Sequence, residues 1–166
     1  DTVMNVAEEI CTMFGREGQL FLCGNGGSAA DAQHIATEFV SRFYKERPAM
    51  NAEALTVNTS TLTAIGNDYS YERVLEAKAK QGDMLIAIST SGTSKNVLEA
   101  LRYAKKQGIK TVLLMGDHEV PELKDICDYV VKVPSKITPR IQEAHIFIGH
   151  TIAEYVEHKL FGEQKL

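Results

Sequence analysis

His34 and Glu38 are two side chains that can transfer protons or hold a metal ion, and they lie four residues apart. In an α-helix this spacing places both side chains on one face. They follow a glycine-rich turn, so a helix that begins at the turn would hold both groups near whatever the turn binds. A pair at this spacing is also common as a weak surface ion pair, which is the alternative interpretation.

The glycine-rich turn, Gly24–Ser28, follows the apolar run Leu20–Cys23 and precedes a helical pattern. Strand, turn and helix in this order direct backbone N–H groups and the positive end of a helix dipole at one point, where an anion fits. Gly24, Gly26 and Ala29 also match the dinucleotide-binding pattern G-x-G-x-x-A. However, no acid follows the second expected strand and no Gly-Lys-Ser/Thr follows the turn, which argues against an NAD site and a Walker P-loop.

A second turn, Ser89–Ser94, carries five hydroxyl groups around one glycine at the start of another expected helix. A single serine or threonine would be enough to cap that helix. Five hydroxyls beside free backbone N–H groups form a neutral cradle for phosphate, whose oxygens accept hydrogen bonds. The two turns together indicate chemistry on a phosphorylated small molecule.

The last expected helix carries several polar residues in a mostly apolar stretch, and buried polar groups need partners. These residues are Gln142, Glu143, His145 and His150. On an ideal helix Gln142 and Glu143 lie equally close in angle to His150, so the spacing does not choose between them. A core histidine with a satisfied ring is the alternative interpretation of His150.

The elements that must position these groups are short apolar strands that alternate with helices. Strands are expected at Leu20–Cys23, Ala54–Val57, Met84–Ile88, Thr111–Met115 and Tyr129–Val133. Helices are expected at Thr2–Phe14, Ser28–Phe43, a short turn ending before Gly66–Asp68, Tyr71–Lys80, Asn96–Lys106, a short segment from Pro121, and Thr138–Leu160 with Thr138 as N-cap.

This alternation is typical of a parallel sheet covered on both faces. The sequence therefore predicts an α/β fold, a three-layer, doubly wound, five-stranded parallel sheet. We expect a single domain, with an N-terminal helix in residues 1–18 and the α/β core in residues 19–166. Both turns should meet at the carboxyl edge of the sheet, where open α/β folds bind ligands.

Composition limits the partners that this chain can have. The net charge of −4 gives no general attraction for nucleic acid or an anionic membrane, so a phosphate site must be local. No apolar run approaches the ~20 residues that span a bilayer. The three cysteines are widely spaced, which favours reduced thiols and a cytoplasmic location.

Four stretches of the chain resemble the SIS (sugar isomerase) domain and, more narrowly, the phosphoheptose isomerase family. They are CGNGGSAADAQHIATE, LTAIGNDY, AISTSGTSKNVLEAL and RIQEAHIFIGH, in that order, and the similarity extends from about Leu20 to Leu160. The chain departs from the family at Thr93, where asparagine is usual, and between Val74 and Gly82, where it is several residues shorter.

The resemblance implies a flavodoxin-like fold and a homotetramer with active sites at subunit interfaces. It also implies conversion of D-sedoheptulose 7-phosphate to D-glycero-D-manno-heptose 7-phosphate, the first step of nucleotide-activated heptose biosynthesis. The alternative is a non-catalytic SIS module that senses a phosphosugar or binds a protein partner, as replication-initiator-associating relatives do. Those relatives lack the acid and the imidazole that are present here as Glu38 and His150.

By position, the resemblance assigns a role to each matching residue. Glu38 corresponds to the catalytic base, which moves the carbon proton through an enediol, and His150 to the acid/base partner that serves the oxygens. In zinc-bearing members the ligands correspond to His34, Glu38, Gln142 and His150, although Glu38 cannot be a tight ligand and a free base at once. The implied substrate-binding residues are Asn25, Gly26, Gly27, Ser28, Glu38, Arg42, Asn67, Asp68, Ser89, Thr90, Ser91, Ser94 and Gln142.

Overall fold

The computed structural model describes residues 2–162, except the side chains of Asn67 and Asp68. Within these residues one parallel sheet has the strand order β2-β1-β3-β4-β5, which confirms the predicted five-stranded parallel fold. The strands are β1 (Leu20–Gly24), β2 (Ala52–Ala54), β3 (Met84–Ile88), β4 (Lys110–Met115) and β5 (Tyr129–Lys132). The helices are α1 (Thr2–Gly15), α2 (Gly27–Val40), α3 (Thr59–Asp68), α4 (Glu72–Lys78), α5 (Lys95–Lys106), α6 (Leu123–Ile126) and α7 (Thr138–Phe161).

The strands β1 and β3 are buried over their full length. Their sequences, LFLCG and MLIAI, are continuous apolar runs, as expected for a sheet with both faces covered. Successive side chains enter different cores, because Leu20 and Leu22 point to one face of the sheet and Phe21 and Cys23 to the other. The sheet is therefore the middle of three layers.

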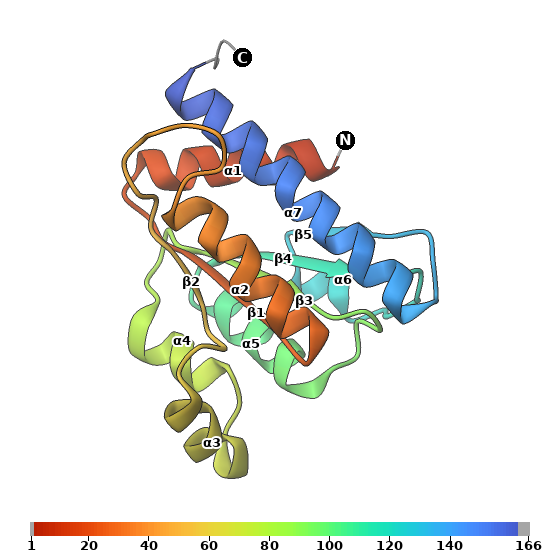
Figure 1. Ribbon diagram of the computed structural model, residues 1–166. Coiled ribbons are helices and arrows are strands. Elements are labelled where there is room, and N and C mark those ends of the chain that lie inside the picture. The colour runs from red at the N-terminus through yellow and green to blue at the C-terminus, as the bar shows by residue number, and fades with distance from the viewer. Residues whose placement is uncertain (1, 163–166) are drawn as a thin grey trace.

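Helices α1, α2 and α7 cover one face of the sheet, and α4, α5 and α6 cover the other (Figure 1). The helix α7 contacts both α1 and α2, so it brings the end of the chain against its beginning. It has 24 residues, but neither it nor any other described helix combines the length and the apolar character that a membrane span needs.

Two helix ends differ from the sequence-based expectation. The helix α2 ends at Val40 rather than Phe43, because Arg47 donates hydrogen bonds to the carbonyl groups at its end. The helix α7 has Ile137 as its N-cap and Thr138 as its first residue, because the Ile137 carbonyl accepts the first helical hydrogen bond.

The expected break at Gly66–Asp68 is wrong. The helix α3 continues through it, and the N–H group of Tyr69 donates to the carbonyl of Ile65. A single glycine inside a helix costs only about 1 kcal/mol, which the neighbouring helical hydrogen bonds offset. Asn58 supplies an N-cap at the other end, where its side chain accepts from the N–H of Thr61.

The strand β2 begins two residues before the expected strand Ala54–Val57 and is shorter than it. Its three residues pair with the first three of β1. Just beyond them, Gln33 Nε2 on α2 donates to the carbonyl oxygen of Thr56. A side chain, rather than a neighbouring strand, satisfies this carbonyl, so the chain leaves the sheet early.

The strands β1 and β3 are neighbours, and their last residues pair Gly24 with Ile88. The glycine turn (Gly24–Ser28) and the hydroxyl turn (Ser89–Ser94) therefore lie side by side at the carboxyl edge of the sheet, as predicted. Helices α2 and α5 begin at these turns, so both helix N-termini face the same edge.

Candidate active site

Three side chains from two helices meet where α2 packs against α7. On α2, His34 Nε2 lies 3.2 Å from Glu38 Oε1. On α7, His150 Nε2 lies 2.7 Å from His34 Nε2 and 3.9 Å from Glu38 Oε1. These three residues, called the His–Glu–His cluster below, are far apart in the sequence and close in space.

Gly149 allows the two helices to approach closely enough for this contact. A Cβ atom added at Gly149 would lie 2.5 Å from side-chain carbons of Ile35, so a larger residue would push α7 away from α2. Ile35 and Gly149 directly adjoin His34 and His150 in the sequence. The close backbone approach thus explains why the two imidazole rings meet.

The cluster lies beside an apolar ring and near a buried carboxylate oxygen that has no hydrogen-bond partner among the described residues. Glu38 has a side chain that is 18% exposed, and the ring of Phe43 lies 5.6 Å from the ring of His150. Asp31, one turn before His34, has a buried Oδ2 atom with no hydrogen-bond partner in the part of the chain that the structure describes. Burial raises the pKa of Asp31, and the nearby His34 opposes part of that rise.

The donor atoms of the cluster suit a transition-metal ion. One ligand atom from each residue lies within 4.8 Å of the other two. Two imidazole nitrogens and a carboxylate oxygen are typical zinc ligands, and catalytic zinc sites commonly have three protein ligands with a position left for water or substrate. The chemistry and spacing of these donors therefore fit zinc.

Gln142 and Glu143 point in different directions. A Cβ atom added at Gly27 would lie 2.4 Å from Gln142 Nε2, so this amide packs directly on the glycine turn. Glu143 is exposed and pairs with Arg140 on the same helix, 2.7 Å away. The geometry directs Gln142, and not Glu143, toward the edge of the sheet that carries the two turns.

The hydroxyl turn is organised by its own side chains. Ser89 Oγ lies 2.9 Å from Ser94 Oγ, and Ser91 Oγ lies 2.9 Å from Thr93 Oγ1. The Gly92 backbone has a φ of +71°, which favours glycine, and its N–H group donates to Ser89 Oγ. These contacts hold the hydroxyl groups in place at the start of α5, where an anion would meet free helix N–H groups.

Asn25 links the two turns through a network that the sequence analysis missed. The amides of Asn25 and Asn96 exchange two hydrogen bonds of 2.8 Å each. The hydroxyl of Tyr71 donates to the carbonyl of Gly24 and lies 3.3 Å from Asn25 Oδ1. Asn96, polar at the start of a helix after a hydroxyl-rich turn, was readable as part of the site, whereas no sequence pattern marks Tyr71.

A cavity of about 740 Å³ opens beside this network, within the usual size range of small-molecule sites. Asn25, Ser94 and Asn96 line it, and Lys95 contributes a cation at the start of α5. Glu72 and Glu99 line it as well, so the neutral cradle that suits a phosphate group is the adjoining hydroxyl turn and not the cavity as a whole.

Three further residues of the expected site are not brought to the cluster by the contacts described. Arg42 lies beyond the end of α2, is exposed, and pairs with Glu46. The side chains of Asn67 and Asp68 lie outside the described part of the structure, so the expected sugar contacts of these two residues stay predictions.

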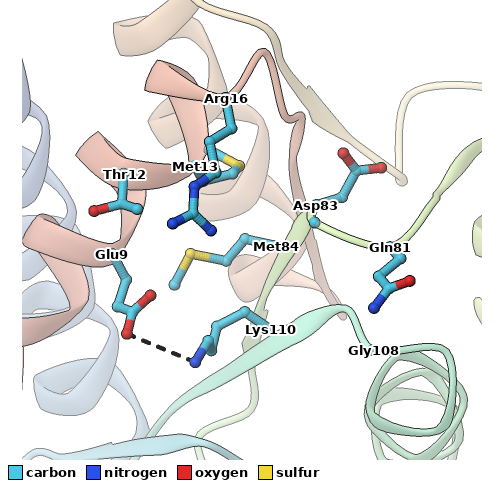
Figure 2. Close-up of a pocket in the computed structure, with 10 residues that line it drawn as sticks. Glu9, Thr12, Met13, Arg16, Gln81, Asp83, Met84, Gly108 and Lys110 are labelled. Carbon is cyan, nitrogen blue, oxygen red and sulfur yellow. Dashed lines mark ion pairs between the residues drawn. The ribbon is translucent and has the colours of Figure 1, made fainter.

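A smaller pocket of about 260 Å³ lies at the opposite, amino edge of the sheet (Figure 2). We call it the amino-edge pocket. Arg16 and Lys110 point into it, and Lys110 forms an ion pair with Glu9 (Figure 2). It contains no imidazole and none of the residues of the two turns, so its chemistry differs from that of the carboxyl edge.

Comparisons with known proteins agree on one family. Residues 1–116 match the family model described as SIS domain. The chain is 51% identical to the phosphoheptose isomerase of Clostridium acetobutylicum, over 99% of this chain and 85% of that protein. It is 52% identical to phosphoheptose isomerase 2 of Campylobacter jejuni, over 97% of this chain and 82% of that protein.

Solved structures give the same result. The phosphoheptose isomerase of Neisseria gonorrhoeae superposes with a TM-score of 0.85 at 36% identity, covering 94% of this chain and 85% of that one. The phosphoheptose isomerase of Francisella tularensis superposes with a TM-score of 0.88 at 30% identity, covering 95% and 85%.

Proposed function

This chain belongs to the phosphoheptose isomerase family of SIS-domain proteins, and we propose that it converts D-sedoheptulose 7-phosphate to D-glycero-D-manno-heptose 7-phosphate. The observation that carries the proposal is the convergence of Glu38 and His150 in one cluster between α2 and α7. A carboxylate and an imidazole in contact are the two groups that an aldose–ketose isomerisation needs.

The reaction moves one proton between carbons and one between oxygens. Glu38 removes a proton from C1 of the open-chain ketose and returns it to C2, through an enediol. His150 serves the oxygens, because the proton on O1 must leave and O2 must gain one. The ring of Phe43 packs beside His150, 5.6 Å from its ring.

His34 is in direct contact with the ring of His150. The two Nε2 atoms are 2.7 Å apart, and two nitrogen lone pairs at that distance would repel. Without a metal ion, one of the rings must therefore donate an N–H to the other. With a zinc ion bound, both lone pairs would face the metal instead.

The two turns and the cluster are separated along α2, as the two ends of the substrate are separated along its chain. In an open-chain ketoheptose 7-phosphate the phosphate and the reacting carbons are at opposite ends. His34 follows Gly27 by seven residues, or about 10 Å along α2. With its phosphate on the hydroxyl turn and the start of α5, the substrate would extend toward Glu38, so the phosphate contributes positioning energy.

We further propose that the His–Glu–His cluster and Gln142 hold a zinc ion. The nitrogen and oxygen donors of the cluster, within 4.8 Å of one another, support this set, and the family resemblance names Gln142 as the further oxygen donor. A bound zinc ion would act as a Lewis acid toward the substrate oxygens. Because Glu38 cannot be a tight ligand and a free base at once, its contact with the metal must be weak during turnover.

The assembly and location are also proposals. We propose a single SIS domain that acts in the cytoplasm as a homotetramer with active sites at subunit interfaces, and that binds neither nucleic acid nor membranes. Large exposed apolar side chains on and beside α7 support burial against a second copy, since Phe147 is 72% exposed. The net charge of −4 supports the absence of polyanionic partners.

The test is a coupled assay for conversion of the ketose to the aldose, with the wild-type chain and Glu38→Gln. The amide keeps the shape of Glu38 but cannot take a proton, so we expect turnover to fall by at least ~10³-fold while sugar-phosphate binding stays measurable. The matched control is Glu154→Gln, an exposed acid one turn after His150 on α7, which should leave turnover unchanged. Near-normal turnover in Glu38→Gln would contradict the assignment.

A further inference from the structure

We propose that Arg47 and Glu157, a buried ion pair outside the cluster, are positioning residues that set the relative placement of Glu38 and His150. The proposal rests on the proposed isomerase function. The two residues are 110 positions apart, and their side chains are only 1% and 2% exposed. Arg47 Nε donates to Glu157 Oε2 at 2.9 Å, which ties the segment after α2 to α7. We call this pair the latch.

One half of the latch holds the end of α2. Arg47 Nη2 donates to the carbonyl oxygen of Glu38 itself at 2.7 Å. Arg47 Nη1 donates to the carbonyls of Phe39 and Ser41 at 2.8 Å each. A cation at a helix C-terminus is favourable, and this guanidinium caps the turn of α2 that carries the proposed base. The backbone of Glu38 cannot move without breaking these bonds.

The other half of the latch holds the segment that contains Phe43, whose ring contacts that of His150. Glu157 Oε1 accepts hydrogen bonds from the N–H groups of Tyr44 and Lys45, and Oε2 accepts one from the N–H of Phe43. Burial alone would raise the pKa of Glu157, but these N–H groups and Arg47 outweigh it and lower the pKa. The carboxylate thus stays charged and keeps the hydrogen bonds described above.

Phe43 connects the latch to the imidazole. Its N–H is held by Glu157, and its ring lies 5.6 Å from the ring of His150. Glu157 also lies seven residues after His150, two turns along the same helix. The latch therefore contacts the backbone of Glu38 directly and His150 indirectly, through Phe43. Neither Arg47 nor Glu157 belongs to the cluster.

A positioning role explains why two charges are buried here. Removing two ions from water offsets much of their attraction, so a buried ion pair is a poor means of stabilising a fold compared with apolar packing. Such a pair instead fixes the relative orientation of the segments that carry it, because the hydrogen bonds between a guanidinium and a carboxylate require a specific geometry.

The test compares Arg47→Met and Glu157→Gln with the wild-type chain, below the thermal transition of each variant. We expect kcat to fall by about 10²-fold, as for a displacement of roughly 1 Å at the reacting groups, with KM for the sugar phosphate within about threefold. The matched control is Lys159→Met, which removes an exposed ion pair between α7 and Glu8 two residues from the latch. The control should keep both constants.

A second measurement does not depend on activity. The imidazole ¹⁵N resonances report the contact between His34 and His150, and we expect both to shift in the latch variants, whereas those of the fully buried His145 stay in place. If the wild-type chain proves inactive while these resonances shift, the proposed function fails and the latch stands. Arg47→Lys, which keeps the charge, covers the case in which Arg47→Met does not fold, and it should show an intermediate loss.

Folded latch variants that keep kcat within about twofold of the wild type, and leave the His34 and His150 resonances unmoved, would overturn the proposal. A lower melting temperature without either change would make the latch a stabilising contact only. That outcome would leave the isomerase function untouched.

Discussion

The two edges of the parallel sheet differ in how far their polar groups are hydrogen-bonded within the protein. At the amino edge the carboxylates of the buried Asp83 and of Asp128 accept hydrogen bonds from the protein itself. Asp83 accepts the N–H groups of Gln19 and Lys80. Asp128 accepts the N–H and hydroxyl of Thr111.

At the carboxyl edge some hydrogen-bonding groups have no partner within the described part of the protein. Two helices begin there, and their first N–H groups have no helical partner. Among the described residues, the buried side-chain atoms without a hydrogen bond are Asp31 Oδ2 and both ring nitrogens of His145, on the two helices that form the cluster. Satisfied polar groups stabilise a fold, whereas a buried polar atom without a partner costs free energy.

The amino-edge pocket also differs from the carboxyl edge, because its charges are complemented within the protein (Figure 2). It lies near the ends of α1 and α5, where helix carbonyl groups carry partial negative charge, and its cations Arg16 and Lys110 complement that charge. Glu9 is shared between Lys110 and the hydroxyl of Tyr129. The pocket is a balanced set of structural charges, so changes there should matter little to turnover.

Among substitutions that compare the two edges, the largest effect should come from Gly27→Ala at the carboxyl edge. Its Cβ would lie 2.4 Å from Gln142 Nε2, the free end of a flexible side chain, so the fold should survive while Gln142 is displaced. We expect kcat/KM to fall by about 10²-fold with little change in the unfolding free energy. At the other edge, Gly15→Ala meets no atom within 4 Å and should leave both quantities unchanged. Equal kinetics for the two variants would remove Gln142 from the site.

An intermediate effect is expected for Ser94→Ala in the hydroxyl turn. A hydrogen bond to a charged phosphate contributes about 1.5 kcal/mol or more, so KM should rise about tenfold while kcat changes little. Thr12→Val, which removes a hydroxyl from the amino-edge pocket, is the matched comparison and should not change KM. If steady-state kinetics gave the reverse order, the phosphate would belong to the other edge.

The smallest effect concerns stability. Burial lowers the pKa of His145 below its usual 6.5, although the backbone of Met115 opposes part of the shift. As pH falls below 6.5 the unfolded chain binds a proton that the folded chain resists, so the unfolding free energy should fall, by at most about 1.4 kcal/mol per pH unit. Urea unfolding at several pH values should show this slope reduced in His145→Gln. The exposed His158→Gln should retain it, and identical slopes in both variants would show that His145 is not its source.

Much of the fold was predictable because its signals are local. The strands β1 and β3 are uninterrupted apolar runs, and each is followed by a turn whose composition marks a helix start. The strand β2 was misplaced because its end depends on Gln33, a side chain from another element. Likewise α2 ends where Arg47 reaches back to it, which no helical periodicity reveals.

The site residues can also be divided into those placed by local sequence and those placed by packing between elements. The spacing of His34 and Glu38 is local and predicts a shared face, and the structure places them 3.2 Å apart. Their contact with His150 depends on the packing at Gly149, and the choice between Gln142 and Glu143 depends on where α7 meets the glycine turn. Glu157 did carry one signal, because it adjoins the buried Val156 in an apolar stretch of α7.

The most direct test of the account is a crystal structure of the Glu38→Gln chain soaked with sedoheptulose 7-phosphate. We expect the phosphate on the hydroxyl turn, with C1 and C2 beside residue 38 and His150. Phosphate bound instead by Arg16 and Lys110, or a sugar that makes no contact with the His–Glu–His cluster, would contradict it.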